Sequence, residues 1–145
     1  MNNKKSSFFN LDGYQVAIIM WIASMLLLFN DKRWVGILLP FLILVFEKKS
    51  AIVRNHAGQL LILNILVFVV SLLFSTIIAM IVALVSWIPL FNVATYTLIA
   101  FVRFLITALF FANHLIGFIK ATRSEVLSLP LIGHLGDRFS QEIRF

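Results

Sequence analysis

Long apolar segments limit what this chain can fold into more than any other feature of its sequence. Residues 60–89 and 93–119 are almost entirely apolar, and shorter apolar segments cover 14–29 and 34–46. Because a helix rises about 1.5 Å per residue, roughly 20 residues cross a hydrocarbon core of about 30 Å. Only 12% of the residues are charged, against about a quarter in soluble domains. We therefore predict an all-α polytopic membrane protein, a four-helix transmembrane bundle with two short and two long spans.

The two short spans are separated only by the polar turn NDKR at 30–33, which predicts an antiparallel helical hairpin. Pro40 lies inside the second span and is expected to kink it, since proline lacks an N–H and clashes with the preceding turn. A re-entrant hairpin that never crosses the bilayer is the alternative. The third helix is expected to begin near Ser50, which can cap it, and to continue to Trp87 over about 55 Å. Its first turns would then stand outside the hydrocarbon core.

The composition divides the chain into three parts. Residues 1–13 form an N-terminal segment, residues 14–120 the transmembrane domain, and residues 121–145 a tail that mixes Leu and Ile with charges. The tail is too polar to span a bilayer, and we expect it to lie at the cytoplasmic membrane surface.

Lysine and arginine are distributed unevenly between the two sides of the predicted bundle. Four spans place both termini and residues 46–61, here called the polar island, on one side. That side holds Lys4, Lys5, Lys48, Lys49, Arg54, Lys120, Arg123, Arg138 and Arg144. The other side holds only Lys32 and Arg33. Since basic residues favour the cytoplasm, we predict a multi-pass cell-membrane protein with cytoplasmic N- and C-termini, whose basic face meets anionic lipid.

Composition and motifs argue against several classes of function. The chain has no cysteine, so disulfides, zinc–thiolate sites and thiol nucleophiles are excluded. Its net charge of +6 is not arranged as a basic stripe with interleaved aromatic residues, and we predict no nucleic-acid binding. It lacks GxSxG, P-loop and glycine-rich dinucleotide motifs, and no intramembrane carboxylate pair could act as acid and base. We therefore predict no enzyme activity, no catalytic residue and no cofactor.

The polar island supplies three candidate functional residues, Arg54, His56 and Gln59. His56 and Gln59 are three residues apart and share a helix face. A metal site would need further ligands, and neither an HExxH motif nor a comparable spacing supplies them, so we predict no metal. We expect these side chains to hydrogen-bond neighbouring helices at the cytoplasmic boundary or to form a docking face.

Arg103 is the most informative single residue of the fourth span. It lies near the middle of the bilayer, where a charge costs at least about 2.5–3.5 kcal/mol, and no Asp or Glu lies inside any predicted span. Thr107 and His114 follow on roughly the same helical stripe. Three roles are open for the guanidinium. It can snorkel to the membrane surface, bond carbonyl and hydroxyl groups inside the bundle, or meet a partner's acid or line a polar path.

The stretch FEKKSAIVRNHAGQLLILNIL resembles a pattern found in a family of small four-span membrane proteins. The positions that match are Lys48, Lys49, Val53, Arg54, His56, Ala57 and Gln59. The ending LSLPLIGHLGDRF is also similar to that of the family, through Pro130, Leu131, Ile132 and Gly133. Asn55 departs from the pattern, which has an aromatic residue before the His. This family is related to the Tic-twenty component of the chloroplast inner-envelope import machinery and has bacterial members without an assigned role. The resemblance implies the four-span fold and, by analogy with the plant relatives, a place in a protein-conducting complex.

Three functions are expected from these features. The first is a non-enzymatic subunit or accessory component of a membrane complex, with a membrane-protein partner or as a homo-oligomer. The second is a self-assembled channel or small transporter, in which Arg103, Thr107 and His114 face a path. The third is a membrane immunity or stress protein.

Overall fold

The computed structural model describes residues 5–7, 11–29, 34–85, 87–129 and 132–142. Within these ranges the secondary structure is helical, apart from an isolated bridge between Lys5 and Asp12. The helices are α1 (Gly13–Leu28), α2 (Val35–Phe46), α3 (Ala51–Val85), α4 (Pro89–Thr122) and α5 (Gly133–Glu142). The predicted all-α class is confirmed, and α5 lies in the predicted tail.

Local sequence explains where the helices begin. The Asp12 backbone N–H donates to the Gln15 side chain over 3.1 Å at the start of α1. Ser50 caps α3 as predicted, since its hydroxyl accepts from the Val53 N–H over 3.3 Å. Pro89 occupies the first turn of α4, where a missing N–H costs nothing, so α4 begins four residues before the predicted span.

The helices differ greatly in length. α3 has 35 residues and α4 has 34, so they are about 52 and 51 Å long. By length and composition, these two helices could cross a membrane. α1 and α2 have 16 and 12 residues, and their lengths of about 24 and 18 Å fall short of a hydrocarbon core of about 30 Å. The crossing of all four helices remains a prediction.

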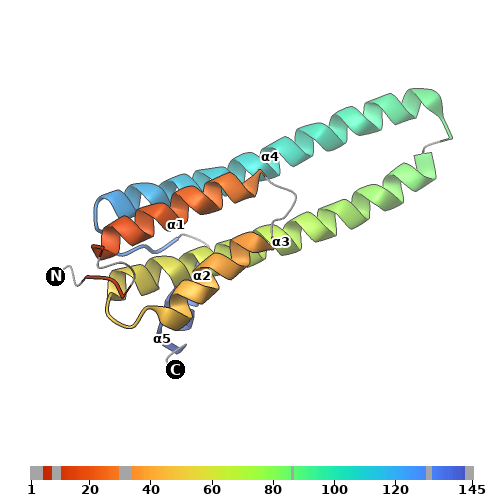
Figure 1. The fold of residues 1–145 in the computed structure, drawn as a ribbon. Coiled ribbons are helices and arrows are strands. Elements are labelled where there is room, and N and C mark those ends of the chain that lie inside the picture. Colours follow the sequence, from red (N-terminus) through yellow and green to blue (C-terminus); the bar gives the residue numbers. More distant parts are fainter. Residues whose placement is uncertain (1–4, 8–10, 30–33, 86, 130–131, 143–145) are drawn as a thin grey trace.

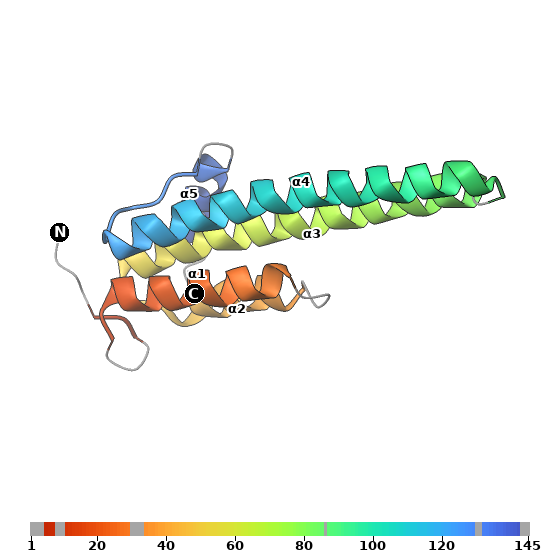
Figure 2. The same cartoon turned by 90° about the horizontal axis from the view of Figure 1, so that it is seen from above.

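The long helices form an antiparallel hairpin that the short helices accompany over only part of its length (Figures 1 and 2). Buried side chains occur in residues 51–67 of α3 and 110–122 of α4, here called the inner half. Residues 68–85 of α3 and 93–109 of α4, the outer half, contribute no buried side chain among those described. α1 packs mainly on α4 and α2 on α3, both along the inner half, and α5 packs on α3.

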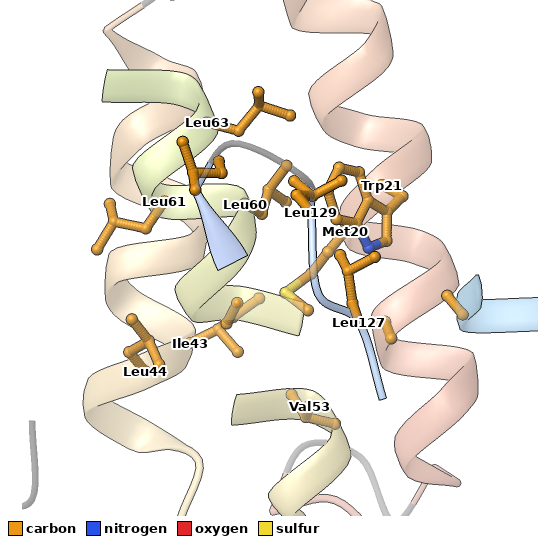
Figure 3. Packing of buried hydrophobic residues seen from close by; sticks show 14 of the residues in the cluster. Met20, Trp21, Ile43, Leu44, Val53, Leu60, Leu61, Leu63, Leu127 and Leu129 are labelled. Carbon is orange, nitrogen blue, oxygen red and sulfur yellow. The ribbon is translucent and has the colours of Figure 1, made fainter. Parts of the chain in front are cut away.

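The hydrophobic core lies in the inner half and includes part of the tail. Figure 3 shows Leu127 and Leu129, from the segment between α4 and α5, beside Met20 and Trp21 of α1 and Leu60 of α3. These five side chains are all buried. Burial of two leucines from the tail was not expected from its mixed composition, which had indicated a segment at the membrane surface.

Candidate functional site

The polar island is buried where α3 begins, and the tail covers it. His56 and Gln59 are fully buried and Asn55 nearly so. All three lie in the first three turns of α3. Their spacing places them on neighbouring positions of the helix surface, which faces the tail. The site is therefore an internal interface between α3 and two described segments of the tail, residues 125–129 and 132–142.

His56 joins α1 to the tail through both of its ring nitrogens. The Trp21 indole N–H donates to His56 Nδ1 over 3.0 Å, and His56 Nε2 lies 2.9 Å from the Glu125 carbonyl oxygen. An indole only donates, so Nδ1 accepts and Nε2 carries the proton that it donates to the carbonyl. The neutral ring with its proton on Nε2 satisfies both partners, and neither nitrogen is left to bind a metal.

Asn55 and Gln59 bind the main chain of the tail. The Asn55 amide donates to the Leu127 carbonyl over 3.2 Å, and the Leu127 N–H donates to Asn55 Oδ1 over 2.8 Å. Gln59 Nε2 donates to the Gly133 carbonyl over 2.8 Å. Both amides also donate to Asp137 Oδ1, over 2.7 and 3.2 Å. Sequence inspection missed Asp137, because the prediction assigned the whole tail to the membrane surface.

Arg54 holds the ends of two helices together. Its guanidinium donates to the Leu44 and Glu47 carbonyls at the end of α2, over 3.0 and 2.9 Å. It also donates to the Ser140 carbonyl near the end of α5, over 2.7 Å. Carbonyls at a helix C-terminus carry partial negative charge and lack intrahelical partners, which makes a cation favourable there. Arg54 therefore stabilises the bundle where α2, α3 and α5 meet.

Glu47 anchors the N-terminal segment beside this junction. Its carboxylate accepts from the Ser6 hydroxyl, from the Ser7 N–H over 2.9 Å, and from the Lys49 and Ser50 N–H groups over 2.9 Å each. Burial raises the pKa of the Glu47 carboxyl, but these hydrogen bonds outweigh it and hold the pKa below its ordinary value.

A second polar cluster ties α1, α2, α3 and α4 together deeper in the bundle. Ser24 of α1 lies 3.1 Å from His114 Nε2 of α4 and donates to Asn64 Oδ1 of α3 over 3.1 Å. Asn64 donates to the Gly36 carbonyl of α2 over 2.7 Å. The Trp21 ring meets the His114 ring edge to face, with centroids 5.6 Å apart. Trp21 and Ser24 are three residues apart on one face of α1, and that spacing could have indicated them as partners of the buried histidines.

The predicted stripe of Arg103, Thr107 and His114 is divided between two environments. His114 is fully buried in the inner half, whereas Arg103 is exposed in the outer half. Arg103 and Thr107 line a groove of about 280 Å³ between α3 and α4, together with Ser71 and Ser75. No hydrogen bond or ion pair joins Arg103 to any residue within the described ranges. Among the described residues, Arg103 is thus a cation without a hydrogen-bonded or ion-paired partner, in a groove that also contains three hydroxyl side chains.

The described residues contain no cluster of three or more His, Asp or Glu side chains that could hold a metal ion. The chemistry of the polar island is instead hydrogen bonding, mainly to main-chain groups and also to the side chains of Trp21 and Asp137, by Arg54, Asn55, His56 and Gln59.

No protein-family model, curated protein or solved structure matches this chain. The resemblance to the Tic-twenty family therefore stays a prediction.

Proposed function

We propose that this chain is a non-enzymatic integral membrane protein that acts as a component of a membrane complex, translocon-like by its resemblance, and that a partner protein binds along the outer half. The observation that carries the proposal is Arg103, a cation that no described residue pairs with, on a two-helix hairpin whose described side chains are otherwise mostly apolar and exposed. A charge at such a position is costly unless an acid or a polar surface meets it.

The length of the exposed apolar surface supports a partner. Exposed apolar side chains recur along α4 from Val93 to Ile119, which is about 39 Å. A hydrocarbon core of about 30 Å covers this length only if the helix tilts by roughly 40°, the upper end of the usual range. A protein neighbour along the outer half would cover the remainder without that tilt.

The partner is inferred to be a different protein that carries an acidic residue within an apolar helix. All six acidic residues of this chain lie outside the four apolar segments, so a second copy has no carboxylate in a span to offer to Arg103. An Arg–carboxylate pair removed from water is strong because both of its hydrogen bonds are charge-assisted.

The membrane placement follows from the same surface. Trp87 and Tyr96 are exposed near the connection between α3 and α4, where aromatic side chains suit a membrane–water interface. We infer that this connection lies on the side of the membrane away from the cytoplasm and that the basic polar island lies on the cytoplasmic side. The shortness of α1 and α2 favours the re-entrant alternative for these two helices.

Photo-crosslinking from the outer half tests the proposal. A photoreactive residue at Phe101, exposed in the outer half, should capture a second polypeptide in native membranes, whereas one at Phe41, exposed on α2, should capture much less. Arg103→Leu should abolish capture at Phe101, and Arg123→Leu, which removes an exposed cation beyond the end of α4, should not. A monomer in mild detergent, together with unchanged behaviour of Arg103→Leu, would refute the proposal.

A self-assembled channel is the second candidate, because Arg103, Thr107, Ser71 and Ser75 line one groove. In that case purified protein in liposomes should conduct anions above the empty-vesicle background, and Arg103→Leu should remove the flux. Burial of His114 shortens the polar path that the sequence had suggested.

A further inference from the structure

Residues 125–129 and 132–142 of the tail pack on the inner half in the manner of a bound ligand, and the surface of α1 and α3 that they cover is called the groove below. The tail residues 125–129 are not helical, and buried and exposed side chains alternate along them: Leu127 and Leu129 are 0% and 1% exposed, and Val126 is 52% exposed. The groove side chains His56 and Asn55 bond the tail's main chain at Glu125 and Leu127. Main-chain bonds combined with two apolar anchors are a common way for a protein to bind a peptide segment.

Helix α5 extends this binding surface along α3. A Cβ added to Gly58 of α3 would lie 2.5 Å from the Gly136 carbonyl oxygen of α5, so the two helices approach too closely for a side chain. Gln59 and Arg54 add bonds to the Gly133 and Ser140 carbonyls. α5 packs against α3 and not to a comparable extent against α4, the helix from which the tail departs. α5 is therefore held mainly by α3, and not by the helix that carries the tail.

The connection between α4 and the tail is short and strained. Ser124 has a φ of 54°, in the left-handed region that residues other than glycine rarely adopt. The turn is closed by the Ser124 N–H donating to the Ala121 carbonyl over 3.0 Å and by an ion pair between Lys120 and Glu125. Both side chains of that ion pair are about two-fifths exposed, so the pair adds little to the stability of the turn. A short strained hinge favours exchange of the element that it carries, since opening releases the strain while the docking contacts are re-formed elsewhere.

We propose that two copies of this chain exchange their tails, so that the groove of each copy binds residues 125–142 of the other. A second copy offers the same sequence and length that the groove already binds. Two copies in one membrane also present groove and tail at the same level, and the reciprocal exchange closes as a two-fold dimer. This inference goes beyond the proposed function, because it involves the inner half and does not depend on Arg103.

Cross-linking between two tagged copies tests the exchange, and the absence of cysteine from the chain makes every introduced thiol unique. Ala51 and Gln141 are exposed and line the same hollow of about 770 Å³ at the end of the bundle. Copies with Ala51→Cys and one tag are co-expressed with copies that carry Gln141→Cys and a second tag, and membranes are treated with a short bismaleimide. We expect a covalent heterodimer that bears both tags. A single chain with both cysteines should link internally, which verifies that the pair reports docking.

Variants of the hinge and tail make the result specific. Ser124→Gly relieves the strain of the closed form and should lower the heterodimer yield by about fivefold. Leu127→Asp should abolish the heterodimer, while Val126→Asp on the exposed side of the same segment should not. Pairing the Ala51→Cys copy with Thr122→Cys, which precedes the hinge, measures cross-linking caused by proximity alone.

The proposal is overturned if the Gln141→Cys mixture gives no more heterodimer than the Thr122→Cys mixture, provided that the doubly substituted chain links internally. It is also overturned if Leu127→Asp leaves the heterodimer yield unchanged. Loss of partner capture at Phe101 with intact exchange would instead refute the proposed function alone.

Discussion

The indole N–H of Trp21 determines the protonation state of His56. Because that N–H points at Nδ1, a second proton on the imidazole would face a donor and lose the bond. The ring is buried, so the displaced indole would also lack water as a substitute partner.

Trp21→Phe removes the indole donor and leaves Nδ1 of His56 without a partner in the core. We expect the free energy of unfolding to fall by about 1–3 kcal/mol from the unsatisfied acceptor, with a further loss from the smaller ring. The unfolding midpoint of detergent-solubilised protein measures the change. Trp34→Phe, at a residue 54% exposed, is the control and should shift the midpoint little; equal shifts in the two variants would contradict the assigned bond.

Glu47 makes stability depend on pH. Its pKa is lowered by the hydrogen bonds that it accepts, so its contribution is fully present above the ordinary carboxyl value of 4.5 and is lost as the pH falls through the lower folded value. The thermal unfolding midpoint of the wild type should therefore decrease once the pH is lowered below about 4.5. Glu47→Gln should be less stable at pH 7 and should show a weaker decline over the acidic range. Parallel profiles for the two proteins would argue against this role.

At the scale of helices, α1 and α4 pack as closely as a glycine allows. A Cβ added at Gly117 would overlap the ring of Trp21. Gly117→Ala should therefore lower the free energy of unfolding by about 1–3 kcal/mol, because the buried indole has no space to move into. At Gly36 the nearest atom to an added Cβ is Asn64 Nδ2 at 3.5 Å, an ordinary contact, so Gly36→Ala is the matched control and should have a small effect. The same unfolding assay compares them, and a larger effect at Gly36 would show that the packing is assigned incorrectly.

The position of the α1–α2 hairpin along α4 allows a test of whether α1 and α2 cross the membrane. The Phe29 ring, just beyond α1, lies 6.0 Å from the Phe111 ring of α4. Phe111 is about 33 Å along α4 from Pro89, so α1 ends far from the connection between α3 and α4. If α1 and α2 form a re-entrant hairpin, Trp34→Cys should resist a membrane-impermeant maleimide added outside intact cells, whereas Trp87→Cys should react. Equal labelling of the two thiols would favour four complete spans.

The sequence predicts where the helices lie along the chain better than which other helices they contact. The Ser50 cap was enough to place the start of α3, because capping is a local signal. The stripe of Arg103, Thr107 and His114 is divided between the two halves of the hairpin for a physical reason. Helical spacing places them on one side of α4, but α1 accompanies α4 only in the inner half. His114 therefore meets Ser24 of α1, whereas Arg103 lies beside α3 alone, in the groove that it shares with Ser71 and Ser75. Where another helix stops cannot be inferred from the periodicity of α4.

At the scale of the whole molecule, the tail was the part least accessible to sequence reasoning. Its charges and glycines indicated a surface segment, and the pattern contained no helical or strand period long enough to suggest burial of Leu127 and Leu129. The polar island was correctly expected to make helix-boundary contacts, yet its main partner is a segment more than 60 residues further along the chain. Such pairings depend on the three-dimensional path of the chain.

That separation has a consequence for how the protein is made. The buried amide N–H groups of Asn55 and Gln59 leave the ribosome about 70 to 80 residues before the carbonyls and carboxylate that accept from them. Until residues 125–140 have been synthesised, α3 therefore presents polar groups that its apolar neighbours cannot satisfy. A chain that stops early keeps these groups exposed. The docking of the tail is thus a completion step, because only the finished chain supplies the groups that these side chains bind.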